Sequence, residues 1–87
     1  MRRMARRDTH EQAIVSALER IGVVVIRVSS PGVPDLLTWR QDRGWLPIEV
    51  KAPGEPLTPA QLALRERACF PVVRSVDEAL ELYGVKA

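Results

Sequence analysis

The sequence predicts an α/β fold in which helices pack against one mixed β-sheet. Three observations lead to this prediction. The chain has 87 residues, which is room for one small domain with a single hydrophobic core. Residues 34–51 hold two apolar runs around a polar segment, as a β-hairpin does. Helical apolar patterns lie before and after this hairpin, so the expected order of elements is α-β-β-β-α-β-α.

The first helix is expected to begin at Asp8. Two overlapping pairs, Asp8 with Glu11 and Thr9 with Gln12, match a capping box, in which a polar cap residue is followed three positions later by Glu or Gln. An apolar stripe at helical spacing follows, made of Ala13, Ile14, Ala17, Leu18 and Ile21. Because Glu11 is in line with this stripe, its carboxylate either completes the cap or reaches into a site beneath the helix. Gly22 is expected to end the helix.

Residues 1–7 are expected to form a basic arm, and residues 8–87 the folded domain. Four arginines lie in the arm, namely Arg2, Arg3, Arg6 and Arg7. This cluster is either part of a solvated, disordered segment or a set of side chains that bind phosphate groups. The net charge of the chain is only +2, which alone is weak evidence for a nucleic-acid partner.

The segment 23–28 is a β-branched run that only Arg27 interrupts. Nearly continuous hydrophobicity predicts a central strand that is covered on both faces. Arg27 either reaches water from the end of the strand or contacts a phosphate. Residues 29–33 form a loop in which the hydroxyl of Ser30 can approach a phosphate backbone, although a plain turn explains these residues equally well.

The hairpin turn is expected to be centred on Asp42, which pairs Asp35 with Glu49 and Trp39 with Trp45. Side chains alternate between the two faces of a strand. The first face therefore carries Asp35, Leu37, Trp39, Trp45, Pro47, Glu49 and Lys51. The second face is mostly aliphatic and is expected to pack under helices, with Leu36, Thr38, Leu46, Ile48 and Val50.

The facing carboxylates of Asp35 and Glu49 suggest a metal site. Their Cβ atoms would lie about 4.5–5.5 Å apart, and like charges in this position destabilise a sheet. A divalent cation is the simplest way to offset that repulsion, since Mg²⁺ takes one or two carboxylates together with water and phosphate oxygens. The alternative is that Asp35 ends a strand and that Glu49 and Lys51 form a surface ion pair.

The remaining segments complete the sheet and its helices. Thr58 caps a helix to about residue 68, with Gln61 as the third residue of a capping box and with Leu62, Ala63 and Leu64 partly buried. Residues 71–74 predict a short strand, and its first residue, Pro71, places it at a strand start or at the edge of the sheet. Ser75 is expected to cap a last helix.

Composition excludes several kinds of protein. The single cysteine, Cys69, rules out an intrachain disulfide and a cysteine-rich zinc site. No stretch has the roughly 20 apolar residues that cross a membrane, and the basic start lacks the apolar segment of a secretory signal. A cytoplasmic location is therefore expected. A chain this small buries only about 60% of its unfolded surface, so a dimer is the default expectation.

Three motifs together resemble one nuclease family. They are residues 31–37 (PGVPDLL), 48–54 (IEVKAPG) and 57–61 (LTPAQ). They are similar to the PD-(D/E)xK nuclease core, and most closely to its VRR-NUC branch, the virus-type replication and repair nucleases. The resemblance covers nearly the whole chain from Asp8 and implies a single restriction-endonuclease-like domain. Glu55 and Cys69 depart from the family pattern, and neither is expected to touch the metal site.

The resemblance also implies the site. Asp35, Glu49 and the backbone carbonyl of Val50 would bind Mg²⁺ or Mn²⁺, with Glu11 as the acidic residue of the first helix. Lys51 would orient the attacking water or stabilise negative charge, and Gln61 would position a water or a ligand. His10 is not needed and is expected at the surface.

The function implied is metal-dependent hydrolysis of phosphodiester bonds in branched DNA, such as Holliday junctions. Stand-alone members of this branch are homodimers and are often phage-encoded. Candidate DNA contacts are Arg6, Arg7, Arg27 and Ser30. The alternative is a DNA-binding or assembly module that keeps the nuclease fold without turnover. A site-specific restriction nuclease is a third possibility, but the chain is short for an added recognition subdomain.

Overall fold

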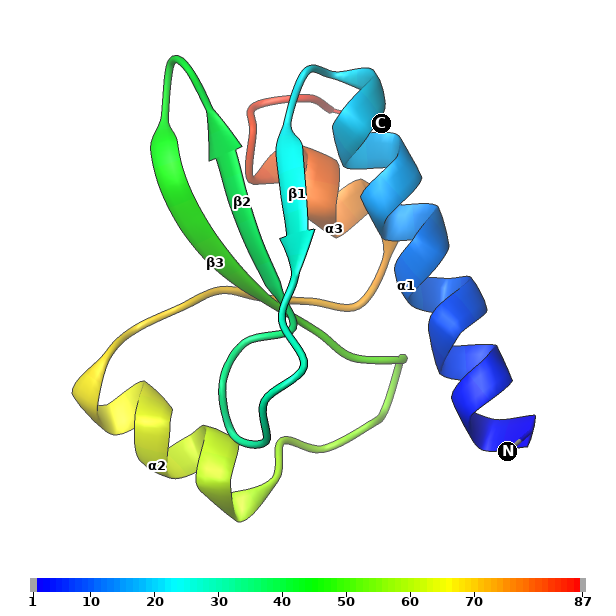
Figure 1. Cartoon of the computed structure of the whole chain (residues 1–87), viewed down its shortest axis with the longest axis vertical. Coiled ribbons are helices and arrows are strands. Elements are labelled where there is room, and N and C mark those ends of the chain that lie inside the picture. The colour runs from blue at the N-terminus through cyan, green and yellow to red at the C-terminus, as the bar shows by residue number, and fades with distance from the viewer. Residues whose placement is uncertain (1, 87) are drawn as a thin grey trace.

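The computed structural model describes the backbone of residues 2–86 and the side chains of residues 9–86. Its elements follow the predicted order (Figure 1). They are α1 (Arg2–Arg20), β1 (Val24–Arg27), β2 (Leu36–Arg40), β3 (Gly44–Val50), α2 (Pro59–Arg67), β4 (Val72–Val73) and α3 (Val76–Glu81). No helix among the described residues has the length and apolar character needed to span a membrane.

The sheet is mixed, as the sequence predicts, with strand order β1-β2-β3-β4. The pairs β1–β2 and β2–β3 are antiparallel, and β3–β4 is parallel. The hairpin has the predicted register, because Trp39 lies opposite Trp45 and Leu36 opposite Ile48. The turn closes with a hydrogen bond of 2.9 Å from the Arg43 amide to the Arg40 carbonyl. This register sets which side chains meet at the far end of the hairpin.

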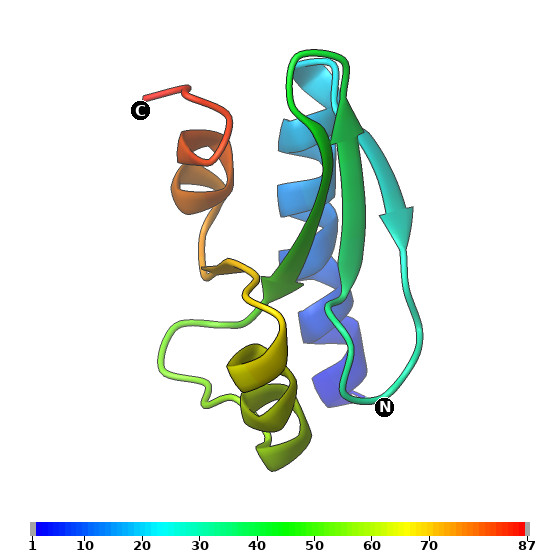
Figure 2. The ribbon, with the colours of Figure 1, turned by 90° about the vertical axis from the view of Figure 1, so that its left-hand side faces the viewer.

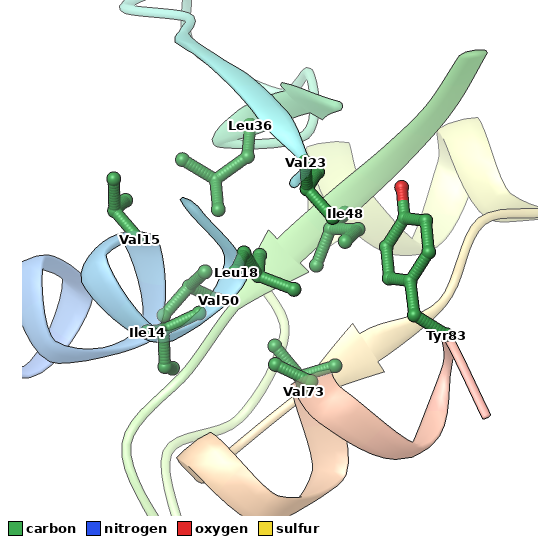
Figure 3. Packing of buried hydrophobic residues seen from close by; sticks show 10 residues of the cluster. Ile14, Val15, Leu18, Val23, Leu36, Ile48, Val50, Val73 and Tyr83 are labelled. Carbon is green, nitrogen blue, oxygen red and sulfur yellow. The ribbon is translucent and has the colours of Figure 1, made fainter. Parts of the chain in front are cut away.

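The core lies on one face of the sheet, beneath α1 and α3. The predicted aliphatic face of the hairpin supplies Leu36, Thr38, Ile48 and Val50, all buried. α1 adds Ile14, Val15 and Leu18, and the C-terminal region adds Val73, Ala79 and Tyr83 (Figure 3). Figure 2 shows α3 on one side of the β1–β3 strands and no described helix beyond β1 on the opposite side.

Thr38 is the polar residue at the centre of this core, so its replacement is an informative test of stability. Its hydroxyl donates to the Leu46 carbonyl at 2.6 Å and lies 2.7 Å from the Tyr83 hydroxyl. Thr38→Val keeps the shape but leaves both partners unsatisfied, and we expect a loss of about 2 kcal/mol in the free energy of unfolding. Urea denaturation measures it. A double-mutant cycle with Tyr83→Phe should show coupling between the two sites, and additive effects would contradict the expectation.

The prediction for residues 23–28 is wrong: β1 is an edge strand that pairs with β2 alone among the described strands. Val25 is partly buried towards the helices, whereas Val24 and Ile26 point to the uncovered face and are about half exposed. Burial alternates along this strand, but apolar residues occupy both of its faces. The alternation therefore leaves no polar–apolar pattern in the sequence.

The predicted start of the first helix is also wrong. α1 begins at Arg2, so Asp8 lies within the helix and does not cap it. Arginine, methionine and alanine are good helix formers, and residues 2–7 consist of them, which extends the helix towards the N-terminus. The side chains of Arg6 and Arg7 lie outside the described part of the structure, so the proposed role of the arm stays a prediction.

The start of α2 is confirmed. The Thr58 hydroxyl accepts from the Gln61 amide at 3.2 Å, and the Gln61 side-chain oxygen accepts from the Thr58 amide at 2.8 Å. Gln61 is buried, but Leu62 and Ala63 are exposed, contrary to the prediction. Successive helical residues are about 100° apart around the axis, so turning Gln61 towards the sheet points its two successors to solvent.

Candidate active site

The candidate site lies where β2 begins and β3 ends. Asp35 immediately precedes β2, and its Oδ2 accepts a hydrogen bond of 3.0 Å from the Val50 amide. The β2–β3 ladder ends at the Leu36–Ile48 pair, so the predicted pairing of Asp35 with Glu49 lies just beyond it. The hydrogen bond from the Val50 amide nevertheless brings Asp35 to the residue next to Glu49, 14 positions away from it in the sequence.

Glu49 and Lys51 form a buried charged pair, so the alternative of a surface ion pair is wrong. Glu49 is 0% exposed and Lys51 is 2% exposed. The Lys51 Nζ lies 3.9 Å from the Glu49 Oε2. Burying charged groups costs free energy unless they are paired and hydrogen-bonded. A buried ion pair at this position therefore points to a functional role.

Gln61 connects α2 to this pair. Its Nε2 donates to the Glu49 Oε2 at 2.9 Å, while its Oε1 accepts the cap hydrogen bond from the Thr58 amide. One amide side chain thus fixes the start of α2 and holds the Glu49 carboxylate in one orientation. The same amide also places the N-terminal end of α2 over the strand end that carries Glu49.

Glu55 is a part of the site that sequence reasoning missed. Its Oε2 lies 3.5 Å from the Lys51 Nζ, and its Oε1 accepts from the Ala52 amide at 2.9 Å. Arg74 holds the turn that carries Glu55, because its Nη1 donates to the carbonyls of Ala52 and Glu55 at 2.8 and 2.7 Å. The spacing of four between Lys51 and Glu55 was visible, but outside a helix such spacing does not predict a contact.

His10 lies closer to the site than expected. It is half-buried, and its Nε2 is 3.2 Å from the Lys51 carbonyl oxygen. The expectation of a surface position followed from starting the helix at Asp8, which put His10 in the first turn. Since α1 begins earlier, His10 lies in the body of the helix and faces the end of β3.

A pocket of about 500 Å³ opens beside these residues. Four predicted site residues line it, namely Ser30, Asp35, Lys51 and Gln61, together with Glu55 and residues of the 31–33 loop. The loop approaches α2 closely at Gly32, where a Cβ atom would lie 3.1 Å from the Cβ of Ala60. The backbone φ of Gly32 is +80°, which also favours glycine. The loop and α2 therefore pack against each other, and both line the pocket.

Glu11 and Arg27 form an ion pair with each other, and neither lines the pocket. The Arg27 Nη1 is 3.4 Å from the Glu11 Oε2, and its Nη2 donates to the Gln12 Oε1 at 2.6 Å. Among the described residues, no group of three or more His, Cys, Asp or Glu side chains is arranged to hold a metal ion. The metal role of Glu11 and the phosphate role of Arg27 stay predictions.

The donor set suits a hard divalent cation. Asp35 and Glu49 offer carboxylate oxygens, and Val50, between Glu49 and Lys51, offers a backbone carbonyl. Mg²⁺ and Mn²⁺ prefer oxygen ligands and are commonly bound through one or two carboxylates, with water and phosphate oxygens completing the shell. The open pocket beside Asp35 leaves room for those further ligands.

Comparisons with known proteins agree on one family. Residues 4–69 match the VRR-NUC domain, and this stretch includes Asp35, Glu49, Lys51 and Gln61. A phage protein named "Putative nuclease p44", from Acyrthosiphon pisum secondary endosymbiont phage 1, is 41% identical over 69 residues, which cover 76% of this chain and 72% of that protein. No solved structure matches the chain.

Proposed function

The chain belongs to the VRR-NUC domain family of nucleases, and from this premise we propose that it is a metal-dependent endonuclease that cuts branched DNA such as Holliday junctions. One observation carries the proposal: Asp35, Lys51 and Gln61 line one pocket, and the buried Glu49 contacts both Lys51 and Gln61. Buried, paired charges beside a pocket are typical of a catalytic centre.

Asp35, Glu49 and the Val50 carbonyl would hold Mg²⁺ or Mn²⁺. When bound, the ion would supply a Lewis acid that lowers the pKa of water next to the scissile phosphate and neutralises negative charge there. The chain's own contribution is to fix these oxygen donors. The Val50 amide fixes Asp35 at 3.0 Å, and the Gln61 amide fixes Glu49 at 2.9 Å.

Lys51 supplies a fixed positive charge for the transition state. Its ammonium group is buried in the pocket wall, where electrostatic stabilisation of a phosphate that gains negative charge is stronger than in water. Glu55, at 3.5 Å, restrains the ammonium group through a second ion pair. Arg74 in turn fixes the Glu55 turn, so it acts on Lys51 from a distance.

Selectivity for branched DNA is proposed to come from DNA shape and phosphate contacts. Ser30 lies in the pocket wall, where its hydroxyl can donate to a phosphate oxygen. Arg27, with Arg6 and Arg7 at the start of α1, are the other proposed phosphate contacts. A four-way junction presents two equivalent strands for cutting, which suits a homodimer with two active sites.

The test compares cleavage of a four-way junction, a flap and a linear duplex built from the same sequences. Each substrate is incubated with Mg²⁺, Mn²⁺ or EDTA. We expect metal-dependent cutting of the branched substrates and little cutting of the linear duplex. Equal cutting of all three would contradict selectivity for branched DNA, and binding without cutting in any metal would favour a non-catalytic module.

Gly32→Ala tests whether the loop and α2 must approach closely to form the pocket. The new methyl group would meet Ala60 at 3.1 Å on a backbone with positive φ, and we expect a tenfold or greater loss of cleavage rate together with about 1 kcal/mol of destabilisation. Gly54→Ala is the matched control, because Gly54 has φ +79° but nothing within 4 Å of its Cβ position. Equal effects of the two substitutions on cleavage would show that the contact with Ala60 is not important.

A further inference from the structure

The outer face of the sheet, opposite α1 and α3, is apolar along three strands. Cross-strand pairs share a face, so Val24 and Ile26 of β1 lie beside Trp39 and Leu37 of β2, and these lie beside Trp45 and Pro47 of β3. We refer to these six residues as the outer apolar face. None of them carries a charge.

This face is open. Val24 is 50% exposed, Ile26 46% and Trp45 59%. In Figure 2 no described helix lies over it beside β1, and α2 lies below, near the end of β3 that carries Glu49. The three residues alone expose on the order of 300 Å² of apolar side chain, the size at which a surface patch on a monomer is often a binding site.

We propose that a second copy of this chain packs on the outer apolar face, sheet against sheet, and forms the homodimer. This proposal rests on the proposed function, which calls for two active sites. A two-fold axis brings the same patch of both copies together, and an uncharged apolar face is complementary to itself. A standard interface takes about 800 Å² from each partner, so the patch is large enough to be its apolar centre.

Packing of the two faces explains the exposed residues better than pairing of the two β1 edges. Edge pairing would extend the sheet but leave Val24 and Ile26 of both copies on its outer surface. It would also leave Trp45 uncovered, because β2 separates β3 from β1. Face packing covers all three strands at once, and two sheets packed in this way lie about 10 Å apart.

DNA is a poorer occupant of this face. Proteins that stack bases on aromatic side chains combine them with a positively charged groove. The outer apolar face has two tryptophans, with ring centroids 6.4 Å apart, but no lysine or arginine among its six residues. Arg27, next to Ile26, is paired with the buried Leu36 and so belongs to the inner face. The pocket lies at the opposite end of the hairpin from Trp45, and none of the six residues lines it.

The face also accounts for the nearly continuous apolar run at 23–28. Such runs are typical of strands covered on both sides, whereas the described residues of this chain cover only the inner side of β1. In the dimer, the partner covers the outer side.

The test is sedimentation equilibrium of the full chain, wild type beside Trp45→Glu and Leu62→Glu. Leu62, 52% exposed on α2, is the matched control because it is a large exposed apolar residue outside the face. We expect a wild-type dimer, a dissociation constant raised about 100-fold or more by Trp45→Glu, and no change with Leu62→Glu. Circular dichroism checks the fold, and Ile26→Lys, on another strand of the same face, should weaken the dimer if Trp45→Glu fails to fold.

A monomeric wild type would overturn the proposal, as would a dimer that only Leu62→Glu disrupts. Loss of DNA binding by Trp45→Glu in a wild type that is monomeric would assign the face to DNA instead. The assay needs no cleavage. A dimer disrupted at Trp45 in a protein that cuts no DNA would support this interface and contradict only the proposed function.

Discussion

Glu49→Gln is expected to lower the rate of DNA cleavage by about a thousandfold or more while leaving the fold intact, since several kcal/mol of transition-state stabilisation depend on the metal. Glutamine keeps the size of the side chain and can still accept the hydrogen bond from the Gln61 Nε2. It removes the negative charge, however, and with it most of the affinity for a divalent cation. Lys51 keeps Glu55 as an ionic partner at 3.5 Å, so the substitution leaves no buried cation unpaired.

Single-turnover cleavage of a four-way junction in Mg²⁺ measures this effect, with circular dichroism to confirm folding. Asp35→Asn should behave in the same way, because Asp35 supplies the other proposed carboxylate ligand. Glu66→Gln, at an exposed position on α2, is the control for loss of one negative charge and should cut at the wild-type rate. A Glu49→Gln variant that folds and retains more than about a tenth of the wild-type rate would refute the assignment of Glu49 as a ligand.

Lys51→Ala should reduce kcat by about a hundredfold or more with little change in KM, because a charge that acts mainly on the transition state affects turnover more than binding. Lys51 is almost completely buried between Glu49 and Glu55. Its removal leaves two carboxylates without their shared cation, so a lower melting temperature is expected as well.

Steady-state kinetics at a temperature well below the melting point of the variant separate the two effects. Lys86→Ala removes an exposed lysine far along the chain and is the control for net charge. If Lys51→Ala raised KM and left kcat unchanged, Lys51 would be a DNA-binding residue and not a group that acts in the chemical step.

The hairpin could be predicted from the sequence because its signals are local and agree with one another. Two apolar runs, a polar turn at Asp42 and Gly44, and the period of two along a strand fix one register, and the structure has it. That register also brings Asp35, which precedes β2, to the end of β3, where its side chain accepts from the Val50 amide. The site was therefore predictable to the extent that it lies on paired strands.

The contacts made by loops could not be predicted in the same way. Glu55 reaches Lys51 only because Arg74, 19 positions further on, holds the intervening turn through two carbonyls. His10 reaches the end of β3 only because of how α1 crosses the sheet. No periodic pattern in the sequence predicts either contact, because each depends on the packing of segments that are distant in the chain.

The error at β1 has a different physical origin. A run of apolar residues shows that both faces of a strand avoid water, but it does not show what covers them. Within one chain, β1 is an edge strand with Val24 and Ile26 exposed. The original expectation of cover on both faces is met only if another molecule supplies the second layer, as proposed for the dimer.

The most direct test of the central claim is a calorimetric titration of Mn²⁺ into the protein, wild type beside Asp35→Asn, without DNA. If Asp35 and Glu49 form the metal site of this nuclease, the wild type should bind Mn²⁺ and the variant should bind it at least tenfold more weakly, because one of two carboxylate ligands is lost. Equal Mn²⁺ binding by the two proteins, both correctly folded, would contradict the claim and place any metal elsewhere in the chain.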